Sequence, residues 1–318
     1  MRIVVTGGAG FVGRELIRLL HDTGEEVLVA DRLRYGMPDW LQTPPEGVRL
    51  SQVDIRDAPA IRGVIEDFRP DAVVHLAAIH YIPECDADPP LAVSTNVTGT
   101  VNVLAACPPG TRFVFASSGA VYEPDEAPHQ EMVSSLKPAD IYGITKLQGE
   151  AYVRAFAADH DLSCGIVRLF NVIGPGETNP HLLPAIIAQL RDGAQSIDLG
   201  NTWPKRDYID VRDAAAGFAA VARGANPPGV DCEVVNLGSG QQYSVDDILA
   251  RMRSVLGLSF EVRQDPRRMR AVDRPYLGAD ISRIREVFDW APANELDATL
   301  ERTWATPDFL PELQGRLT

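Results

Sequence analysis

Tyr142 and Lys146 are four positions apart in a run of residues that is typical of a helix. Positions i and i+4 lie on one face of a helix, so the phenol and the ammonium would be neighbours. A phenol has an ordinary pKa of about 10 and is a poor base near neutral pH. A neighbouring ammonium favours the phenolate, so this pair could perform acid/base chemistry. The spacing alone is a weak indication, because an exposed helix can also carry such a pair.

A glycine-rich run, TGGAGFVG at positions 6–13, joins an expected strand to an expected helix that begins at Phe11. The run satisfies both GxGxxG and GxxGxxG. Glycines there let the backbone turn tightly and approach a pyrophosphate, while the N–H groups at the start of the helix face the phosphates. The sequence therefore predicts a dinucleotide site whose phosphate-binding residues are Gly7, Gly10, Phe11, Val12 and Gly13.

Asp31 narrows the choice of dinucleotide. It ends the second expected strand, 18 residues after Gly13. A carboxylate at that place can accept hydrogen bonds from both hydroxyls of the adenosine ribose, and it would repel a 2′-phosphate. These properties favour NAD over NADP. Arg32 weakens this inference, since an arginine beside this position can reduce the preference for NAD over NADP.

Short β-branched runs alternate with helical stretches through the first half of the chain. Strands are expected at 2–6, 26–31, 48–53, 71–76, 112–116 and 163–169, and helices at 11–23, 58–68, 90–106 and 139–160. This alternation predicts an α/β fold, a Rossmann-type doubly wound parallel sheet. Residues 1–170 would form the NAD-binding domain, with 207–237 returning to it. Residues 171–318 would form a smaller C-terminal region that binds substrate.

Composition excludes several other classes of protein. Lys and Arg total 30 and Asp and Glu total 44, so the formal net charge is −14. Such an acidic chain is poorly suited to nucleic acid or to an anionic membrane surface. It has no apolar run long enough to cross a bilayer and no signal peptide, which favours the cytoplasm. Its four cysteines form no CxxC pair, so we expect reduced thiols and no metal site.

Several motifs occur in a fixed order over nearly the whole chain. Besides the glycine run and YGITK at 142–146, they are HLAA at 75–78, FASSGAVY at 115–122, RLFNVIGPG at 168–176 and RDYIDVRDAA at 206–215. With them the sequence resembles the extended short-chain dehydrogenases/reductases, in the branch of NAD-dependent sugar-nucleotide epimerases and dehydratases. The order of the motifs is highly specific, although each one is modest by itself.

The resemblance implies a role for each matching position. Tyr142 would be the catalytic acid/base, Lys146 would hold the nicotinamide ribose and lower the Tyr142 pKa, and Ser118 would hydrogen-bond the reacting sugar hydroxyl. Further cofactor contacts would be Asp54, Ile55, Leu76, Ala77, Ala78, Asn96 and Ser117. Substrate contacts would be Ser118, Asn171, His181, Leu183, Arg206, Arg268 and Arg270. His80 and Tyr81 follow the HLAA run, and either substrate contact or an ordinary loop position explains them.

The neighbours of Ser118 select among the reactions of this branch. Dehydratases and decarboxylases of the family usually carry an acidic residue directly after the Ser/Thr, whereas Gly119 and Ala120 follow here. We therefore expect inversion at C4 of a nucleoside-diphosphate sugar through a transient 4-keto intermediate, in a homodimer formed through two long helices. The alternatives are a 4-keto-sugar reductase, then a dehydratase, a decarboxylase or an epimerase at another carbon. A non-catalytic NAD-binding protein is the alternative from another class.

Overall fold

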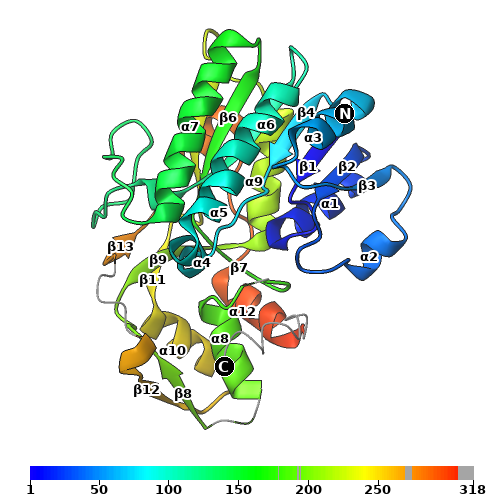
Figure 1. Cartoon of the computed structure of the whole chain (residues 1–318). Coiled ribbons are helices and arrows are strands. Elements are labelled where there is room, and N and C mark those ends of the chain that lie inside the picture. The colour runs from blue at the N-terminus through cyan, green and yellow to red at the C-terminus, as the bar shows by residue number, and fades with distance from the viewer. Residues whose placement is uncertain (178, 192, 194, 269–273, 307–318) are drawn as a thin grey trace.

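The computed structural model describes residues 1–318 except 178, 192, 194, 269–273 and 307–318. Its larger part is built on a seven-stranded sheet in the order β10-β6-β5-β4-β1-β2-β3, with every neighbouring pair parallel (Figure 1). The strands are β1 (Arg2–Thr6), β2 (Glu26–Asp31), β3 (Val48–Gln52), β4 (Ala72–His75), β5 (Arg112–Ser118), β6 (Ser163–Leu169) and β10 (Cys232–Leu237). The predicted Rossmann-type α/β fold is confirmed.

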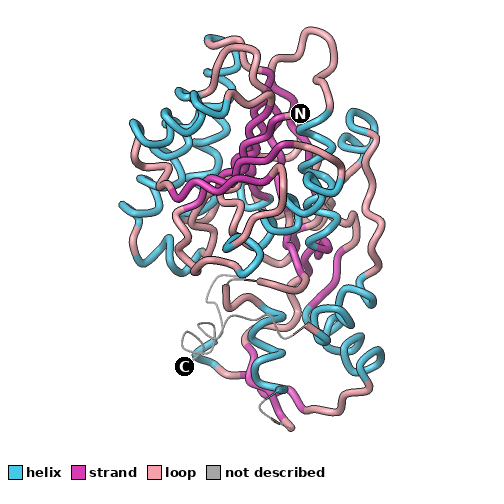
Figure 2. The backbone as a smooth tube through the Cα atoms, turned by 90° about the vertical axis from the view of Figure 1, so that its right-hand side faces the viewer, coloured by secondary structure: helices cyan, strands magenta, loops and turns pink. Residues whose placement is uncertain are grey.

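Helices cover both faces of this sheet (Figure 2): α1 (Phe11–Asp22) and α9 (Val211–Arg223) one face, and α3 (Ala58–Phe68), α6 (Gly99–Ala106) and α7 (Ile141–Asp159) the other. Alternate residues of a strand point to opposite faces. In β1, Ile3 and Val5 therefore join the core under α1 and α9, while Val4 joins the core under α3 and α7. One short apolar strand thus contributes to two cores, which explains why the strands lack polar alternation.

The helix expected over 90–106 is interrupted in the structure. It consists of α5 (Pro89–Val93), a wider π-helical turn (Ser94–Thr98) and α6. Within that turn the buried Asn96 side chain donates a hydrogen bond to the Ile79 carbonyl oxygen, outside the helix. The Thr100 hydroxyl donates to the Asn96 carbonyl oxygen at 2.7 Å. Side chains inserted into the backbone ladder are a known cause of such turns. Two short helices, α2 (Asp39–Gln42) and α4 (Ile82–Ala87), lie in loops of the same part of the chain.

The smaller part of the molecule lies below the large sheet in Figure 1 and has its own apolar core. A four-stranded sheet contains β7 (Asn171–Ile173), β9 (Lys205–Asp210), β11 (Gln242–Ser244) and β13 (Tyr276–Leu277). A parallel pair consists of β8 (Ser196–Leu199) and β12 (Glu261–Gln264). The helices of this part are α8 (Leu182–Arg191), α10 (Val245–Leu256) and α12 (Leu296–Ala305), while α11 (Ser282–Phe288) packs against β10 of the large sheet. Among the described residues, no helix combines the length and apolarity needed to span a bilayer.

The segment 207–237, expected to return to the large sheet, divides between the two parts. Strand β10 pairs with β6 at the edge of the large sheet, and α9 packs against α1. The residues at the start of the segment belong to β9, which pairs with β7 and β11 in the smaller sheet. The chain therefore crosses between the parts at the junction of β9 and α9. The proposed domain division at residue 170 stays a prediction.

A buried ion pair joins α7 to the large sheet. Arg168 Nη2 of β6 donates to Glu150 Oε2 of α7 at 2.8 Å, and the two side chains are 1% and 0% exposed. The Ser117 hydroxyl donates to the other Glu150 oxygen at 2.6 Å, and Arg168 also donates to the Tyr122 hydroxyl. Burial raises the pKa of Glu150, but the hydrogen bonds and charge of Arg168 outweigh it and leave the pKa below its usual value. The carboxylate is thus fully engaged inside the protein.

Replacing Glu150 with alanine should destabilise the fold strongly. Glu150→Ala leaves the buried Arg168 guanidinium without its carboxylate, a change that typically costs about 3–5 kcal/mol. The matched control is Arg154→Ala, which removes the partly exposed second partner of the same carboxylate and should cost at most about 1 kcal/mol. The free energy of unfolding is measured by urea denaturation. Similar small losses in both variants would contradict this account of the ion pair.

Candidate active site

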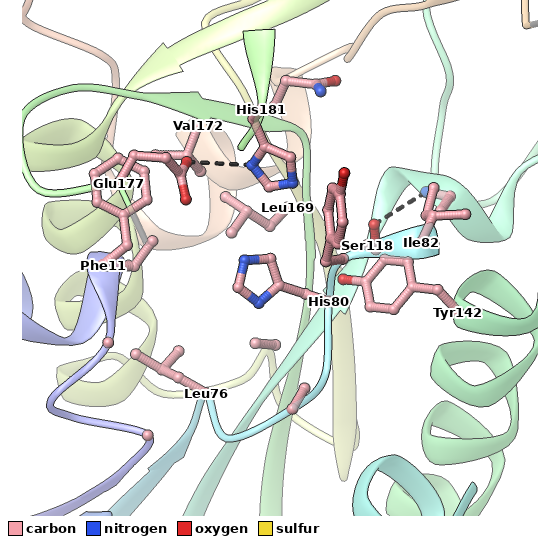
Figure 3. A pocket seen from close by; sticks show the side chains of 18 of the residues that line it. Phe11, Leu76, His80, Ile82, Ser118, Tyr142, Leu169, Val172, Glu177 and His181 are labelled. Atoms are coloured by element: carbon pink, nitrogen blue, oxygen red, sulfur yellow. Dashed lines mark hydrogen bonds and ion pairs between the residues drawn. The ribbon is translucent and has the colours of Figure 1, made fainter. Parts of the chain in front are cut away.

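A cavity of about 1000 Å³ runs along the carboxyl ends of the central strands (Figure 3). The chain passes from β1 outward to β2 and β3 and then crosses back to β4 on the other side of β1. Loops that leave β1 and β4 therefore part in opposite directions, and a crevice at such a point is a common ligand site. Residues of the smaller part, including Asn171, Leu183 and Arg206, line the other side of the cavity.

The glycine loop after β1 fits a pyrophosphate. Gly7 has a φ of +73°, and a Cβ there would lie 2.7 Å from the backbone nitrogen of Ala77. A Cβ at Gly13 would lie 2.5 Å from the Gly7 carbonyl oxygen. Helix α1 begins after Gly10 with no side-chain cap and no acidic residue in its first turn. Its first residues line the cavity, so N–H groups and the positive end of the helix dipole are available to an anion.

Asp31 lies at the edge of the same cavity, at the end of β2. Its Oδ2 accepts a hydrogen bond from the Ala9 N–H at 3.0 Å, and its Oδ1 accepts one from the Leu33 N–H at 2.7 Å. Burial raises the pKa of this carboxyl, and the two backbone hydrogen bonds offset part of that effect. A carboxylate oxygen accepts more than one hydrogen bond, so Asp31 can still receive ribose hydroxyls. Arg32 lies beside it, 3.7 Å from Asp54.

Ser118, Tyr142 and Lys146 all line the cavity. Ser118 ends β5 and Tyr142 lies in the first turn of α7, and Figure 3 shows their side chains beside each other. The Ser118 oxygen also accepts the Ala120 N–H at 3.1 Å, so its own proton is available to another acceptor. Lys146 Nζ donates to the Ala116 carbonyl oxygen at 2.8 Å and lies 5.8 Å from the centre of the Tyr142 ring. The structure therefore brings together the three side chains that the sequence singled out.

Burial shifts the pKa values of the two titratable groups at this site. It raises the pKa of Tyr142 well above its usual value, and the neighbouring Ser118 hydroxyl offsets only part of the increase. Burial also lowers the pKa of Lys146 to about 8. Desolvation disfavours the charged form of each group. The role of Lys146 in lowering the Tyr142 pKa stays a prediction.

All residues expected to contact the cofactor line the cavity except Asn96. The lining residues are Gly7, Gly10, Phe11, Val12, Gly13, Asp31, Arg32, Asp54, Ile55, Leu76, Ala77, Ala78, Ser117, Tyr142 and Lys146. Asn96 is buried behind them, where its amide accepts the Ile79 N–H at 2.8 Å and donates to the Ile79 carbonyl oxygen at 2.9 Å. It also donates to the Thr145 hydroxyl. Asn96 therefore fixes the loop after β4 against α7 instead of facing the cavity.

The residues expected to bind substrate line the side of the cavity near the smaller part, and they are Ser118, Asn171, His181, Leu183, Arg206 and Arg268. Arg206 donates to the Arg274 carbonyl oxygen at 2.7 Å, a bond that orients its guanidinium at the cavity wall. Arg268 lies 3.7 Å from Asp265. Arg270, the remaining predicted contact, lies outside the described residues.

Several cavity residues were not singled out from the sequence. Arg274 lines the cavity and donates to Asp140 Oδ2 and to the Ala120 carbonyl oxygen, both at 3.1 Å. It lies six residues after the predicted substrate contact Arg268, and that proximity in the sequence was the available signal. His80 and Glu177 also line the cavity. His80 was left open between substrate contact and an ordinary loop position, and because both loops lack a periodic pattern, nothing in the sequence placed it beside Glu177.

The comparisons with known proteins agree with this geometry. The profile of the NAD dependent epimerase/dehydratase family matches residues 3–238, about three quarters of the chain. The chain therefore belongs to the NAD-dependent epimerase/dehydratase family. The resemblance seen in the sequence is confirmed, and so is NAD as the cofactor.

Individual relatives match over nearly their full length. A UDP-glucose 4-epimerase of Streptomyces lividans is 31% identical over 320 residues, covering 95% of each chain. The solved UDP-glucose 4-epimerase of Thermus thermophilus, in complex with NAD, is 27% identical with a TM-score of 0.82, covering 96% of this chain and 98% of that one. A UDP-glucose 4-epimerase from Stenotrophomonas maltophila, with bound NAD and formylated UDP-arabinopyranose, has a TM-score of 0.86 at 25% identity and covers both chains fully.

Asp31→Asn should weaken NAD binding and reduce the preference over NADP. The amide keeps an acceptor oxygen but loses the charge. Hydrogen bonds to a charged group are worth about 1.5–3 kcal/mol, and 1.4 kcal/mol corresponds to about tenfold in affinity. We expect NAD affinity to fall about tenfold or more, with NADP affinity held or improved. Calorimetric titration of both dinucleotides checks this, with exposed Asp39→Asn as the control. An unchanged ratio of the two affinities would refute the ribose assignment.

Proposed function

We propose that this protein is an NAD-dependent 4-epimerase of a nucleoside-diphosphate sugar, with UDP-hexoses as its substrate class. The observation that carries the proposal is that Ser118 and Tyr142 lie beside each other on the cavity wall, with Lys146 lining the same cavity. The length and identity of the relatives described as UDP-glucose 4-epimerases support the choice of reaction and of nucleotide. The cytoplasm, expected from the sequence, is the proposed location.

In the proposed reaction Tyr142 accepts the proton of the sugar C4 hydroxyl, and Ser118 bridges the two oxygens as the proton moves. The glycine loop and Asp31 would hold NAD, whose chemistry would be reversible hydride acceptance at C4, so the sugar would be oxidised to a 4-ketone and reduced again with no net redox change. The 4-keto sugar turns over between the two transfers and presents its other face. Tyr142 then returns the proton to the new C4 alkoxide.

The wall next to Ser118 favours epimerisation over elimination. Gly119 and Ala120 follow Ser118, so the chain supplies no carboxylate at the positions directly after the hydroxyl to assist loss of water. A Cβ at Gly119 would lie 3.1 Å from the Phe170 ring, so a larger residue would have to displace that ring. Small residues at this place leave room for a keto sugar to rotate. The same three side chains could also serve a 4-keto-sugar reductase, which differs in its need for external NADH.

The basic residues of the cavity suit the substrate diphosphate. Arg206, Arg268 and Arg274 all line it, on the side where the smaller part closes over the large sheet. A planar guanidinium can bind two phosphate oxygens at once, which makes arginine well suited to a diphosphate. We assign these three arginines to the diphosphate, with Asn171 beside them at the start of the smaller part.

The decisive experiment is to incubate the pure protein with a panel of nucleoside-diphosphate sugars, starting with UDP-glucose, and to follow the products by NMR. We expect a C4 epimer to form without added NADH, because the hydride returns to the sugar in every cycle. Product that requires stoichiometric NADH would replace the proposal with a ketoreductase. A 4-keto-6-deoxy product would mean that the cavity supports dehydration without a carboxylate beside Ser118.

Tyr142→Phe should reduce turnover by about 10²-fold or more, since general acid/base catalysis contributes about 10²–10⁴-fold. NAD binding should change little, because the phenol contributes a proton and not the pyrophosphate or ribose contacts. Steady-state kinetics and a calorimetric NAD titration give the two readouts. Tyr152→Phe, on an exposed part of the same helix, is the control and should keep full turnover. Near-normal turnover in Tyr142→Phe would remove Tyr142 from the mechanism.

We also propose that two copies associate through α5 and α7. Large apolar side chains on these helices are exposed, with Ile144 at 41%, Tyr152 at 44% and Val93 at 42%. Tyr152→Glu should place a charge in that interface and shift the molar mass measured by light scattering from two chains to one. A wild-type protein that runs as a monomer at all concentrations would contradict the dimer.

A further inference from the structure

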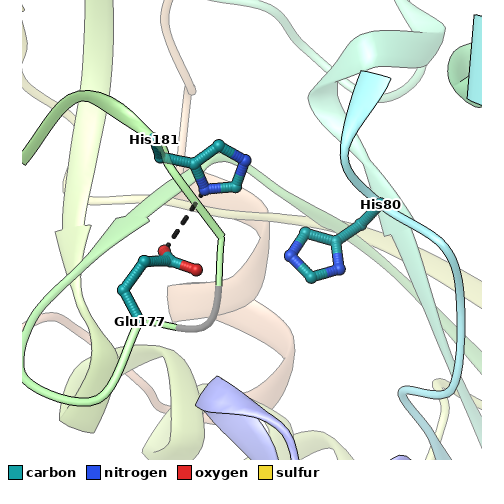
Figure 4. A group of neighbouring side chains, drawn as sticks. All are labelled: His80, Glu177 and His181. Atoms are coloured by element: carbon teal, nitrogen blue, oxygen red, sulfur yellow. Dashed lines mark ion pairs between the residues drawn. The ribbon is translucent and has the colours of Figure 1, made fainter. Parts of the chain in front are cut away.

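Three potential metal ligands meet on one wall of the cavity (Figure 4). His80 lies in the loop after β4, while Glu177 and His181 lie between β7 and α8. One ligand atom from each residue lies within 4.8 Å of the other two, and Glu177 is only 4% exposed. All three side chains also line the cavity that holds Ser118 and Tyr142, so the cluster has access to small molecules.

The spacing within the cluster suits an ion better than a strong hydrogen bond. His181 Nδ1 lies 3.3 Å from Glu177 Oε2, whereas a charge-assisted N–H···O bond is usually about 2.7–2.9 Å long. A tetrahedral ion with bonds of about 2.0–2.1 Å holds its ligand atoms about 3.3–3.4 Å apart. This pair therefore already has the separation of one tetrahedral edge. His80 would need to approach by at most about 1.4 Å, which a side-chain rotation can supply.

In this structure a hydrogen bond occupies the lone pair of His80 Nε2. His80 Nε2 lies 2.9 Å from the amide nitrogen of Asn179, which donates to it in the tautomer that carries the ring proton on Nδ1. A bound ion would take the place of that amide as the partner of Nε2. Two imidazole nitrogens and one carboxylate are the ligands of many zinc sites that keep one position open. Mg²⁺ and Ca²⁺ favour all-oxygen ligands, so the donor set selects against them.

We propose that His80, Glu177 and His181 bind Zn²⁺ or another divalent cation of similar ligand preference, with one coordination position open to the cavity. A phosphate or hydroxyl oxygen of a bound substrate would be the ligand at that position. The site is a property of these three side chains and goes beyond the proposed epimerase reaction.

The test measures metal binding in the full-length chain after treatment with a chelator. We expect calorimetry and elemental analysis to give one Zn²⁺ per chain, and Co²⁺ to give the visible absorption of a tetrahedral site. His181→Ala and Glu177→Gln should each weaken Zn²⁺ binding by at least about tenfold, because even the loss of a supporting residue costs about 10–100-fold. The matched control is His21→Ala, which removes an exposed histidine 3.2 Å from the carboxylate of Asp22 and should leave binding unchanged.

Two outcomes would overturn the proposal. One is a wild-type chain that takes up no stoichiometric Zn²⁺ and shows no tetrahedral Co²⁺ spectrum. The other is unchanged uptake in both ligand variants, with folding verified by thermal melting and by NAD binding. If a variant does not fold, the wild-type stoichiometry and Co²⁺ spectrum still decide the question. Metal content is independent of turnover, so failure of the epimerase proposal and failure of this one are distinguishable.

Discussion

The close contact between α7 and β5 is the constraint on which the candidate active site depends. The contact is possible because two residues of the helix lack a side chain. A Cβ at Gly149 would lie 2.5 Å from the Phe115 ring, and one at Gly143 would lie 2.6 Å from a carbonyl oxygen in the turn after β5. Any larger residue would push the helix away from the strand. That displacement would separate Tyr142 on the helix from Ser118 at the end of the strand. The proposed proton path between the two hydroxyls would then be broken.

The same close packing removes water from the charged groups, and this explains the opposing pKa shifts. Burial raises the pKa of Tyr142 and lowers that of Lys146 to about 8, so each group resists the charged form that catalysis would use. Glu150, one helical turn beyond Lys146, escapes this effect because Arg168 lies directly against it. Glu150 differs from Tyr142 and Lys146 because the opposite charge of Arg168 lies directly against it. At the site of Tyr142 and Lys146, burial therefore opposes the charged form of both groups.

The sequence predicted the larger part of the fold well because its strands are short apolar runs separated by glycine and capping residues. Tyr142 and Asp31 were identifiable for the same reason, since each stands at a fixed place relative to a strand or helix, whereas Ser118 was predicted only from the family resemblance. Asn96 was wrongly expected at the cavity, because its role depends on a π-helical turn that periodicity does not reveal. His80 and its neighbours on the cavity wall come from irregular loops, and only tertiary structure brings such loops together. Sequence patterns therefore identify residues tied to regular elements and miss those held by loops.

Charge behaves differently at the scale of the chain and at the scale of the cavity. A net charge of −14 makes the chain poorly suited to nucleic acid, yet Arg32, Arg206, Arg268 and Arg274 all line one cavity. Exposed charges farther apart than about 8 Å are largely screened at physiological ionic strength, so a ligand inside the cavity responds mainly to its immediate neighbours. A nucleoside diphosphate would be repelled weakly during approach and attracted strongly once inside. The acidic surface thus discourages polyanions, which cannot enter, while the arginines retain small anions that can.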